Sequence, residues 1–154
     1  MFARRVQRDT RNFLTTPPEF TSGIHVDPTN MRKVYFRISG IPAPSPYEGG
    51  EYIVRLDLPE DYPMMPPNIV MLTPSGRFSV GTKICTSFTA FHKDSWTPMY
   101  DFTAILRSFV SFMLDDEETG HVGYSRGTDE SRRKMAAESA AWNETKQYDA
   151  MFTQ

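Results

Sequence analysis

The sequence predicts an α+β fold in which an N-terminal helix, an antiparallel meander of strands, an irregular segment and C-terminal helices follow one another. Three observations predict this class. Apolar residues recur at helical spacing near both ends, they alternate in the first half, and a long stretch between shows no period. The 154 residues give room for one domain with a sizeable core and not for two, so we expect a single domain over residues 1–154.

The first element is an amphipathic helix over residues 2–14, because Val6 and Phe13 lie seven positions apart on one face. The prolines at 17–18 end it. Three basic residues share the opposite face: Arg4, Arg8 and Arg11. This stripe is either a solvated face or a docking surface for an acidic partner.

Residues 33–39 and 51–58 alternate apolar and polar side chains, which predicts two half-buried strands. The connection over 41–50 is rich in proline and ends in two glycines, as is typical of a hairpin connection. A further apolar run at 69–72 follows a second proline-rich loop. Together these runs predict an antiparallel meander of three or four strands.

Residues 73–100 have no sustained period, and so long an irregular segment inside a compact domain is usually functional. Residues 102–114 predict a buried helix. A last helix is expected from about residue 128 to residue 152, with acidic residues at its start that suit the helix dipole.

Composition excludes several classes of protein. Seventeen basic against nineteen acidic residues, with a pI near 5.9, argue against a dedicated nucleic-acid binder. No apolar run approaches the roughly twenty residues of a membrane span, and no apolar region follows the N-terminus as in a secretory signal. A single cysteine excludes an internal disulfide framework and a cysteine-rich zinc site, and it is compatible with a reducing cytosol.

That cysteine, Cys85, lies in the irregular segment close to Lys83. A lone cytosolic cysteine is more often an inert buried residue than a nucleophile, but reactive thiols do occupy polar, electropositive surroundings. His92 and Asp94 follow closely, which allows a Cys/His hydrolase as one interpretation. The short spacing argues against it, because such triads assemble from distant parts of a fold.

Several motifs of the chain occur in the order and approximate spacing of one family: PYEGG at 46–50, LPEDYP at 58–63, PP at 66–67, Cys85, and WTP at 96–98. In these motifs the chain resembles the ubiquitin-conjugating enzymes, over nearly its whole length. Further segments resemble the J-type, ER-associated branch: TPSGRF at 73–78, KIC at 83–85, FHKDSW at 91–96 and SFM at 111–113.

The resemblance implies a four-stranded meander and a transferase. Ubiquitin would pass from its activating enzyme to Cys85 as a thioester, in an ATP-dependent pathway, and then to a Lys, or a Ser or Thr, of a substrate protein with the help of a ligase. Splitting the acyl transfer in this way needs no metal and no cofactor. The irregular segment would form a groove for the ubiquitin C-terminus against the 102–114 helix. A non-catalytic ubiquitin-binding variant of the same fold is the alternative.

One departure keeps that alternative open. The family usually has His-Pro-Asn before the cysteine, where the Asn amide supports the loop or stabilises the oxyanion, and this chain has Thr73, Pro74 and Ser75. The Ser75 hydroxyl can donate one hydrogen bond but reaches less far than an amide. The residue after the cysteine is Thr86, where leucine is usual.

His92 resembles a J-type histidine associated with hydroxyl acceptors. A hydroxyl needs a base far more than an amine does, and an imidazole suits that task near neutral pH. The alternative is a surface histidine without a role.

The resemblance also implies partner surfaces. Arg4, Arg5 and Arg8 fall on the helix shared by the activating enzyme and the ligases. Met64 falls in the first ligase-contacting loop, with core filling by Met64 and Met65 as its alternative, and Pro98 and Met99 fall in the second loop.

The expected location is the cytoplasm, or the cytosolic face of the ER if a C-terminal anchor has been removed, since J-type relatives carry such an anchor. ER-associated protein degradation is the process that this branch implies. The sequence does not identify the substrate, the ligase, the chain linkage or the choice between ubiquitin and a related modifier.

Overall fold

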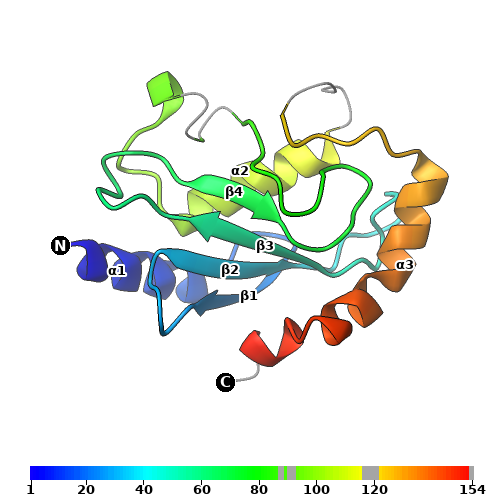
Figure 1. Cartoon of the computed structure of the whole chain (residues 1–154), viewed down its shortest axis with the longest axis horizontal. Helices are drawn as coiled ribbons and strands as arrows, with labels where there is room; N and C mark the ends of the chain where they lie inside the picture. The colour runs from blue at the N-terminus through cyan, green and yellow to red at the C-terminus, as the bar shows by residue number, and fades with distance from the viewer. Residues whose placement is uncertain (87–88, 90–92, 116–121, 153–154) are drawn as a thin grey trace.

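The computed structural model describes residues 1–86, 89, 93–115 and 122–152. Its elements follow the predicted order (Figure 1): α1 (Phe2–Thr15), β1 (Thr21–Val26), β2 (Lys33–Ile38), β3 (Tyr52–Asp57), β4 (Asn68–Met71), the short 3-10 helix η1 (Lys93–Ser95), α2 (Phe102–Leu114), α3 (Asp129–Thr145) and the 3-10 helix η2 (Asp149–Phe152). The α+β class and the predicted meander are confirmed.

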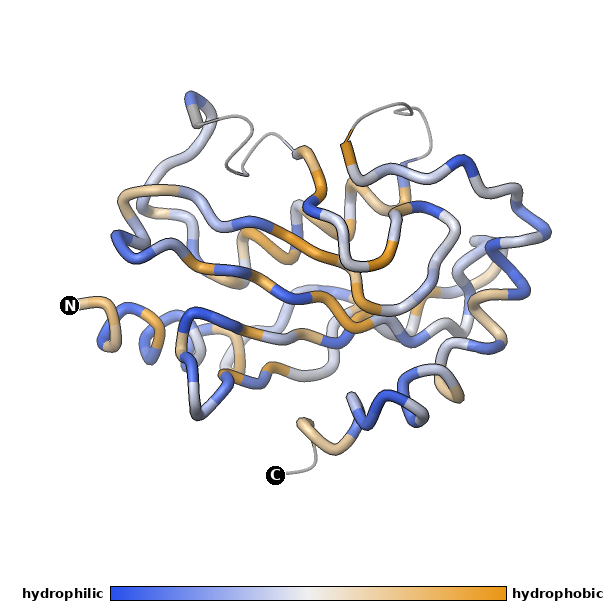
Figure 2. Tube along the Cα trace, viewed as in Figure 1, coloured by the Kyte–Doolittle hydropathy of each residue, from blue (hydrophilic) through white to orange (hydrophobic). Residues whose placement is uncertain are grey.

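The four strands form one antiparallel sheet in the order β1-β2-β3-β4. Its inner face packs against α1 and α2, where the Phe36 ring lies 5.1 Å from that of Phe13 and 5.7 Å from that of Phe102. Figure 2 shows hydrophobic residues gathered along the central strands, whereas hydrophilic residues predominate along α3. Among the described helices, none combines the length and apolar character that crossing a bilayer requires.

Strand β1 is the first strand of the meander and lies at the edge of the sheet beside β2. No pattern in the sequence predicted its position. It is an edge strand whose residues are mostly half-buried, so apolar and polar positions do not alternate as they do in β2. Its outer face is covered by η2, where Phe152 packs so close to Gly23 that a Cβ there would lie 2.8 Å from the ring.

The prediction of one helix from residue 128 to residue 152 is wrong for the residues after 145. Helix α3 ends at Thr145, Gln147 adopts a left-handed φ of 60°, and the amide of Tyr148 donates to the carbonyl of Asn143. The chain then turns back onto the sheet, where Tyr148, Met151 and Phe152 cover a small apolar cluster on the outer face. That cover is a tertiary contact, which helical periodicity alone does not reveal.

A buried carboxylate fastens α1 to two loops. The side chain of Asp9 is fully buried, and it accepts hydrogen bonds from Arg5 Nε at 3.0 Å, from the Tyr62 hydroxyl at 2.9 Å and from Arg8 at 3.4 Å. Arg5 also donates to the carbonyl of Tyr100 at 2.7 Å. Helix α1, the β3–β4 loop and the loop before α2 thus share one polar cluster.

Arg5, which the resemblance assigned to the partner-binding helix together with Arg4 and Arg8, is turned toward this cluster. Its side chain is only 11% exposed, because the buried Asp9 requires a charged partner one helical turn away. Arg4, Arg8 and Arg11 remain exposed on α1.

We expect Asp9→Ala to lower the free energy of unfolding by about 3–5 kcal/mol, because it leaves Arg5 and the Tyr62 hydroxyl without their buried partner. Asp9→Asn should cost less, since its amide oxygen still accepts one hydrogen bond. Exposed Asp61, next to Tyr62, provides the control. Urea unfolding should give a change within about 0.5 kcal/mol for Asp61→Ala, and equal losses in both Ala variants would contradict the role of Asp9.

Burial raises the pKa of Asp9 above its ordinary value, against the opposing effect of Arg5. The folded protein therefore binds this proton more readily than the unfolded chain does, and protonation favours folding as the pH falls. The difference in unfolding free energy between wild type and Asp9→Asn should shift in favour of wild type between pH 7 and pH 4. A shift in the opposite direction would show that Arg5 outweighs burial.

Candidate functional site

Cys85 lies where the irregular segment passes beside the sheet. The amide of Ile84 donates to Ile69 of the β4 edge at 2.9 Å, and the amide of Cys85 donates to the carbonyl of Val122 at 3.0 Å. Ile84 and Thr86 are buried, whereas Cys85 between them is half-exposed. The backbone around the cysteine is thus held from two sides, while the residue itself is only partly buried.

The residue whose carbonyl holds Cys85, Val122, directly precedes a strand-like segment that sequence reasoning missed. Residues 123–127 pair with residues 76–79 through three backbone hydrogen bonds: Ser79 to Gly123 at 2.8 Å, Ser125 to Arg77 at 2.9 Å and Gly127 to Gly76 at 3.0 Å. We call residues 76–79 and 123–127 the paired ribbon. Its place beside the cysteine is a tertiary feature, with no hydrophobic pattern to reveal it.

Gly123 allows this close approach. Its φ is +85°, and a Cβ there would lie 2.6 Å from the carbonyl oxygen of Lys83 and 2.9 Å from the Cα of Ile84. Any other residue would combine backbone strain with a clash next to Cys85. The glycine was visible in the sequence, but only the fold shows which backbone it faces.

Thr73 joins three parts of the chain through its buried hydroxyl. Its Oγ1 accepts from the amide of Ile53 at 2.9 Å and donates to Asn143 Oδ1 at 2.6 Å. The amide group of Asn143 in turn donates to the carbonyl of Glu51 at 2.8 Å. Thr73 thereby ties the start of the irregular segment to β3 and α3.

Ser75 is fully buried and bonded locally. Its Oγ accepts hydrogen bonds from the amides of Arg77, at 3.1 Å, and Phe78, at 3.2 Å. This is the geometry of a side chain that caps a turn. Two roles were expected for Ser75, loop support and stabilisation of the oxyanion. The contacts of Ser75 in the structure are of the kind that supports a loop.

The candidate partner residues gather at the α1 end of the molecule. Met64 is 65% exposed and Met99 is 86% exposed, so Met64 does not fill the core, and Pro98 is half-exposed. The Trp96 indole donates to the carbonyl of Pro63 at 2.8 Å, which holds the two loops together. Figure 1 shows both loops on the side of the molecule where α1 begins.

His92 lies outside the described residues, and the structure gives no geometry for it. Asp94, its neighbour in the sequence, is exposed in η1. In the described part of the chain, no three His, Cys, Asp or Glu side chains are grouped so that they could hold a metal ion.

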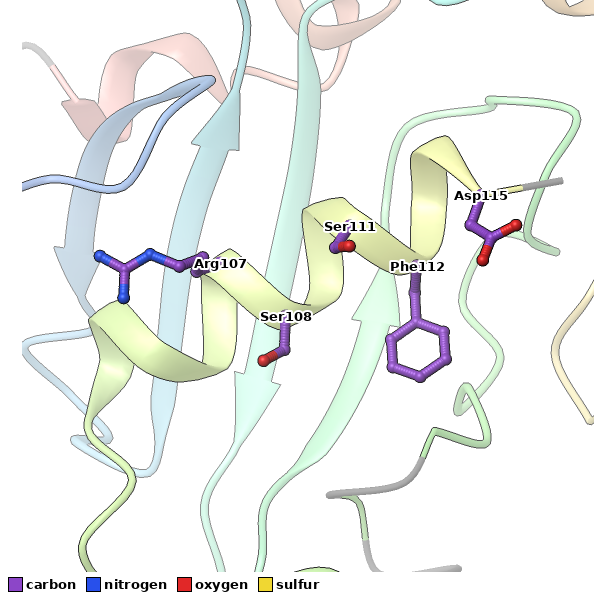
Figure 3. Close-up of a pocket in the computed structure, with 5 residues that line it drawn as sticks. All are labelled: Arg107, Ser108, Ser111, Phe112 and Asp115. Carbon is purple, nitrogen blue, oxygen red and sulfur yellow. The ribbon is translucent and has the colours of Figure 1, made fainter.

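An open hollow of about 380 Å³ lies along the exposed side of α2. Its lining residues are Arg107, Ser108, Ser111, Phe112 and Asp115. Figure 3 shows Ser108 and Phe112 on the same side of the helix, with Asp115 at its end. This surface begins next to the paired ribbon, since α2 ends where Arg77 contacts it.

Comparison with known proteins gives one family. The family model described as ubiquitin-conjugating enzyme matches residues 5–146. The ubiquitin-conjugating enzyme E2 6 of Kluyveromyces lactis is 36% identical over 141 residues, which are 91% of this chain and 54% of the relative. The ubiquitin-conjugating enzyme E2 J2 of Homo sapiens is 38% identical over 116 residues, 75% of this chain and 44% of the relative. The chain spans about half the length of these curated relatives.

Two solved structures have the same fold. A ubiquitin-conjugating enzyme from Plasmodium falciparum superimposes with a TM-score of 0.61 and 26% identity, covering 76% of this chain and 86% of that one. The corresponding Plasmodium vivax protein gives a TM-score of 0.59 and 28% identity, covering 72% of this chain and 99% of that one.

Proposed function

Because the chain belongs to the ubiquitin-conjugating enzyme family, we propose that it accepts ubiquitin as a thioester on Cys85 and transfers it to a substrate protein. The observation that carries this proposal is the setting of Cys85, a partly exposed residue between buried neighbours on a backbone held from two sides. A nucleophile needs both access and a fixed position.

The reaction divides into two acyl transfers. In the first, the Cys85 thiolate attacks the C-terminal carbonyl of ubiquitin on its activating enzyme, a new thioester forms, and the activating enzyme leaves as a thiolate. In the second, a substrate amine attacks the Cys85 thioester, an amide bond forms, and the Cys85 thiolate is released while the amine loses a proton.

Ser75 supports the loop in this proposal. Its oxygen already accepts two backbone amides, so its contribution is to hold the turn that leads into the paired ribbon. Loss of one oxyanion donor costs on the order of 100-fold in other enzymes. Other donors must therefore stabilise the oxyanion, or the intrinsic rate of transfer is low.

The docking surfaces follow from the exposed residues at the α1 end. We assign Arg4 and Arg8 to the activating enzyme and the ligase, and Met64, Pro98 and Met99 to the ligase. Exposed methionines adapt to varied partner surfaces. The open hollow along α2 supports this helix as the surface against which the bound ubiquitin would lie.

The acceptor and the cellular setting rest on the J-type resemblance. His92 would act as the general base for Ser or Thr acceptors, in addition to transfer to Lys. The same resemblance supports ER-associated degradation at the cytosolic face of the ER as the process, and the similarity to E2 J2 agrees with that branch.

Cys85→Ala should abolish the ubiquitin adduct formed with activating enzyme, ubiquitin and ATP, whereas Cys85→Ser should accumulate an oxyester that resists reductant. Cys85 is the only cysteine, so a reductant-sensitive adduct on the wild type can form nowhere else. Gels run with and without reductant make the measurement. An adduct in the Ala variant would refute the thioester site, and a wild type that never loads would favour the non-catalytic alternative.

Reversing the charge of two exposed arginines, in Arg4→Glu/Arg8→Glu, should slow loading of Cys85 roughly 10-fold at low salt, because exposed charges act mainly on the association rate. The effect should shrink at high salt through screening. Arg126→Glu/Lys134→Glu is the matched control, with the same change in net charge at exposed positions before and within α3. Equal slowing in both double variants would make the effect one of net charge alone.

His92→Ala should leave loading intact but slow discharge to free serine or threonine by roughly 100-fold, the size of a general-base contribution. Discharge to lysine should change much less, because an amine can lose its proton to solvent after it attacks. His25→Ala is the control, because His25 lies on β1, at the sheet edge opposite to that beside Cys85. Equal losses toward both acceptors would instead indicate that His92 supports the Cys85 segment.

A further inference from the structure

Arg77 is the largest side chain that the described part of the fold buries completely, with 1% of its surface exposed. Arginine is almost never fully buried unless its charge is compensated, because removal of a cation from water is costly. A buried guanidinium therefore requires a structural or functional reason. In the sequence, Arg77 is distinguished only by its place in the TPSGRF motif at 73–78.

The guanidinium binds the end of α2. Its Nη2 donates to the carbonyl of Phe112 at 3.1 Å and to the carbonyl of Asp115 at 2.8 Å. The last carbonyls of a helix have no partner within the helix and carry the negative end of its dipole. A cation placed there satisfies two of these acceptors and fixes where the helix ends.

The same guanidinium also binds the paired ribbon. It lies 4.7 Å from the centre of the Tyr124 ring and 5.1 Å from that of Phe78, one aromatic from each half of the ribbon. Such contacts stabilise a cation that has been removed from water. The backbone of Arg77 adds a hydrogen bond from the amide of Ser125 at 2.9 Å. The side chain and the backbone of one residue thus join α2 to the ribbon.

The ribbon continues directly to the cysteine. Val122, the residue before Gly123, supplies the carbonyl that accepts from the amide of Cys85, and Gly123 packs against Lys83 and Ile84. A shift of the ribbon relative to α2 therefore moves the acceptor that holds Cys85. It also moves Cys85 relative to the hollow formed by Ser111, Phe112 and their neighbours on α2.

We infer that Arg77 is a positioning residue that fixes the position of Cys85 relative to the exposed side of α2. The inference rests on the proposed function, because it concerns the step in which ubiquitin is bound to Cys85 and lies against α2. In the proposed reaction, loading involves the Cys85 thiol alone, whereas discharge involves a ubiquitin that is already bound to Cys85 and that would lie against the hollow on α2. Arg77 therefore acts more on discharge than on loading.

Three variants test this role. Arg77→Met keeps much of the apolar volume but removes every donor, and Arg77→Lys keeps the charge but cannot bridge two carbonyls while stacking on two rings. Arg132→Met is the matched control. Arg132 is also buried and donates to the same segment, at the carbonyl of Gly76 from α3 at 3.3 Å, and it stacks on Tyr47.

The first measurement uses the unloaded protein. Hydrogen exchange followed by NMR should show the Cys85 amide exchanging at least about 10-fold faster in Arg77→Met than in wild type, because its acceptor on Val122 is displaced. In Arg132→Met, the exchange rate of the Cys85 amide should increase by no larger a factor than the exchange rates of the β3 amides in the same variant. An unchanged Cys85 amide in Arg77→Met would overturn the inference. This readout does not require ubiquitin transfer, so it is independent of the proposed function.

The second measurement separates the two steps. Single-turnover discharge of the loaded protein to free lysine should fall on the order of 10-fold to 100-fold in Arg77→Met, the scale of a misplaced reacting group. Loading by Arg77→Met should fall by less than about 3-fold once it is corrected for the folded fraction. The discharge rate of Arg77→Lys should lie between those of wild type and Arg77→Met. In Arg132→Met, discharge and loading should change by the same factor. Proportional losses in both steps would reduce Arg77 to a stability role.

If Arg77→Met does not fold, both measurements are made on Arg77→Lys instead, because a lysine can still donate a hydrogen bond to one α2 carbonyl. A folded Arg77→Lys with the wild-type ratio of discharge to loading and a protected Cys85 amide would overturn the inference. A wild type that never forms the thioester would instead overturn the proposed function, and the exchange data would still test the connection between Arg77 and Cys85.

Discussion

The packing of one sheet face against α1 and α2 is the constraint on which the rest of the molecule depends. Phe36 lies between Phe13 of α1 and Phe102 of α2, and burial of such aromatic rings is among the largest favourable contributions in a core of this size. Once α2 is fixed on the sheet, its two ends place the functional segments. The loop that bears Met99 leads into its start, and Arg77 binds its end.

Buried polar side chains do in the irregular segments what apolar packing does in the core. Asp9 holds α1 to two loops, Thr73 ties the irregular segment to β3 and α3, and Arg77 ties it to α2. Each of these groups is costly to bury unless its hydrogen bonds are made. The satisfied state is therefore narrowly defined, so loops without regular structure can hold the partly exposed Cys85 and the exposed Met64 in fixed places.

This division separates the residues that would act on partners from those that hold them. The former are exposed or half-exposed, and the latter are almost fully buried. Thr73 and Ser75, which stand where the family usually has His and Asn, belong to the second group by their contacts. In this chain the two residues therefore brace the segment that leads to Cys85.

The sequence by itself determined the fold class, helices α1 and α2, strands β2, β3 and β4, and Cys85 as the residue to examine, because periodicity and motif order are local properties. It missed β1, placed the end of α3 too late and assigned Arg5 to the surface. Only the tertiary structure decided that Asp9 draws Arg5 inward, that Gly123 lies against the Cys85 segment and that Arg77 joins α2 to the paired ribbon. Each of these depends on which distant backbone a residue faces, and pairings of that kind leave no period in the sequence.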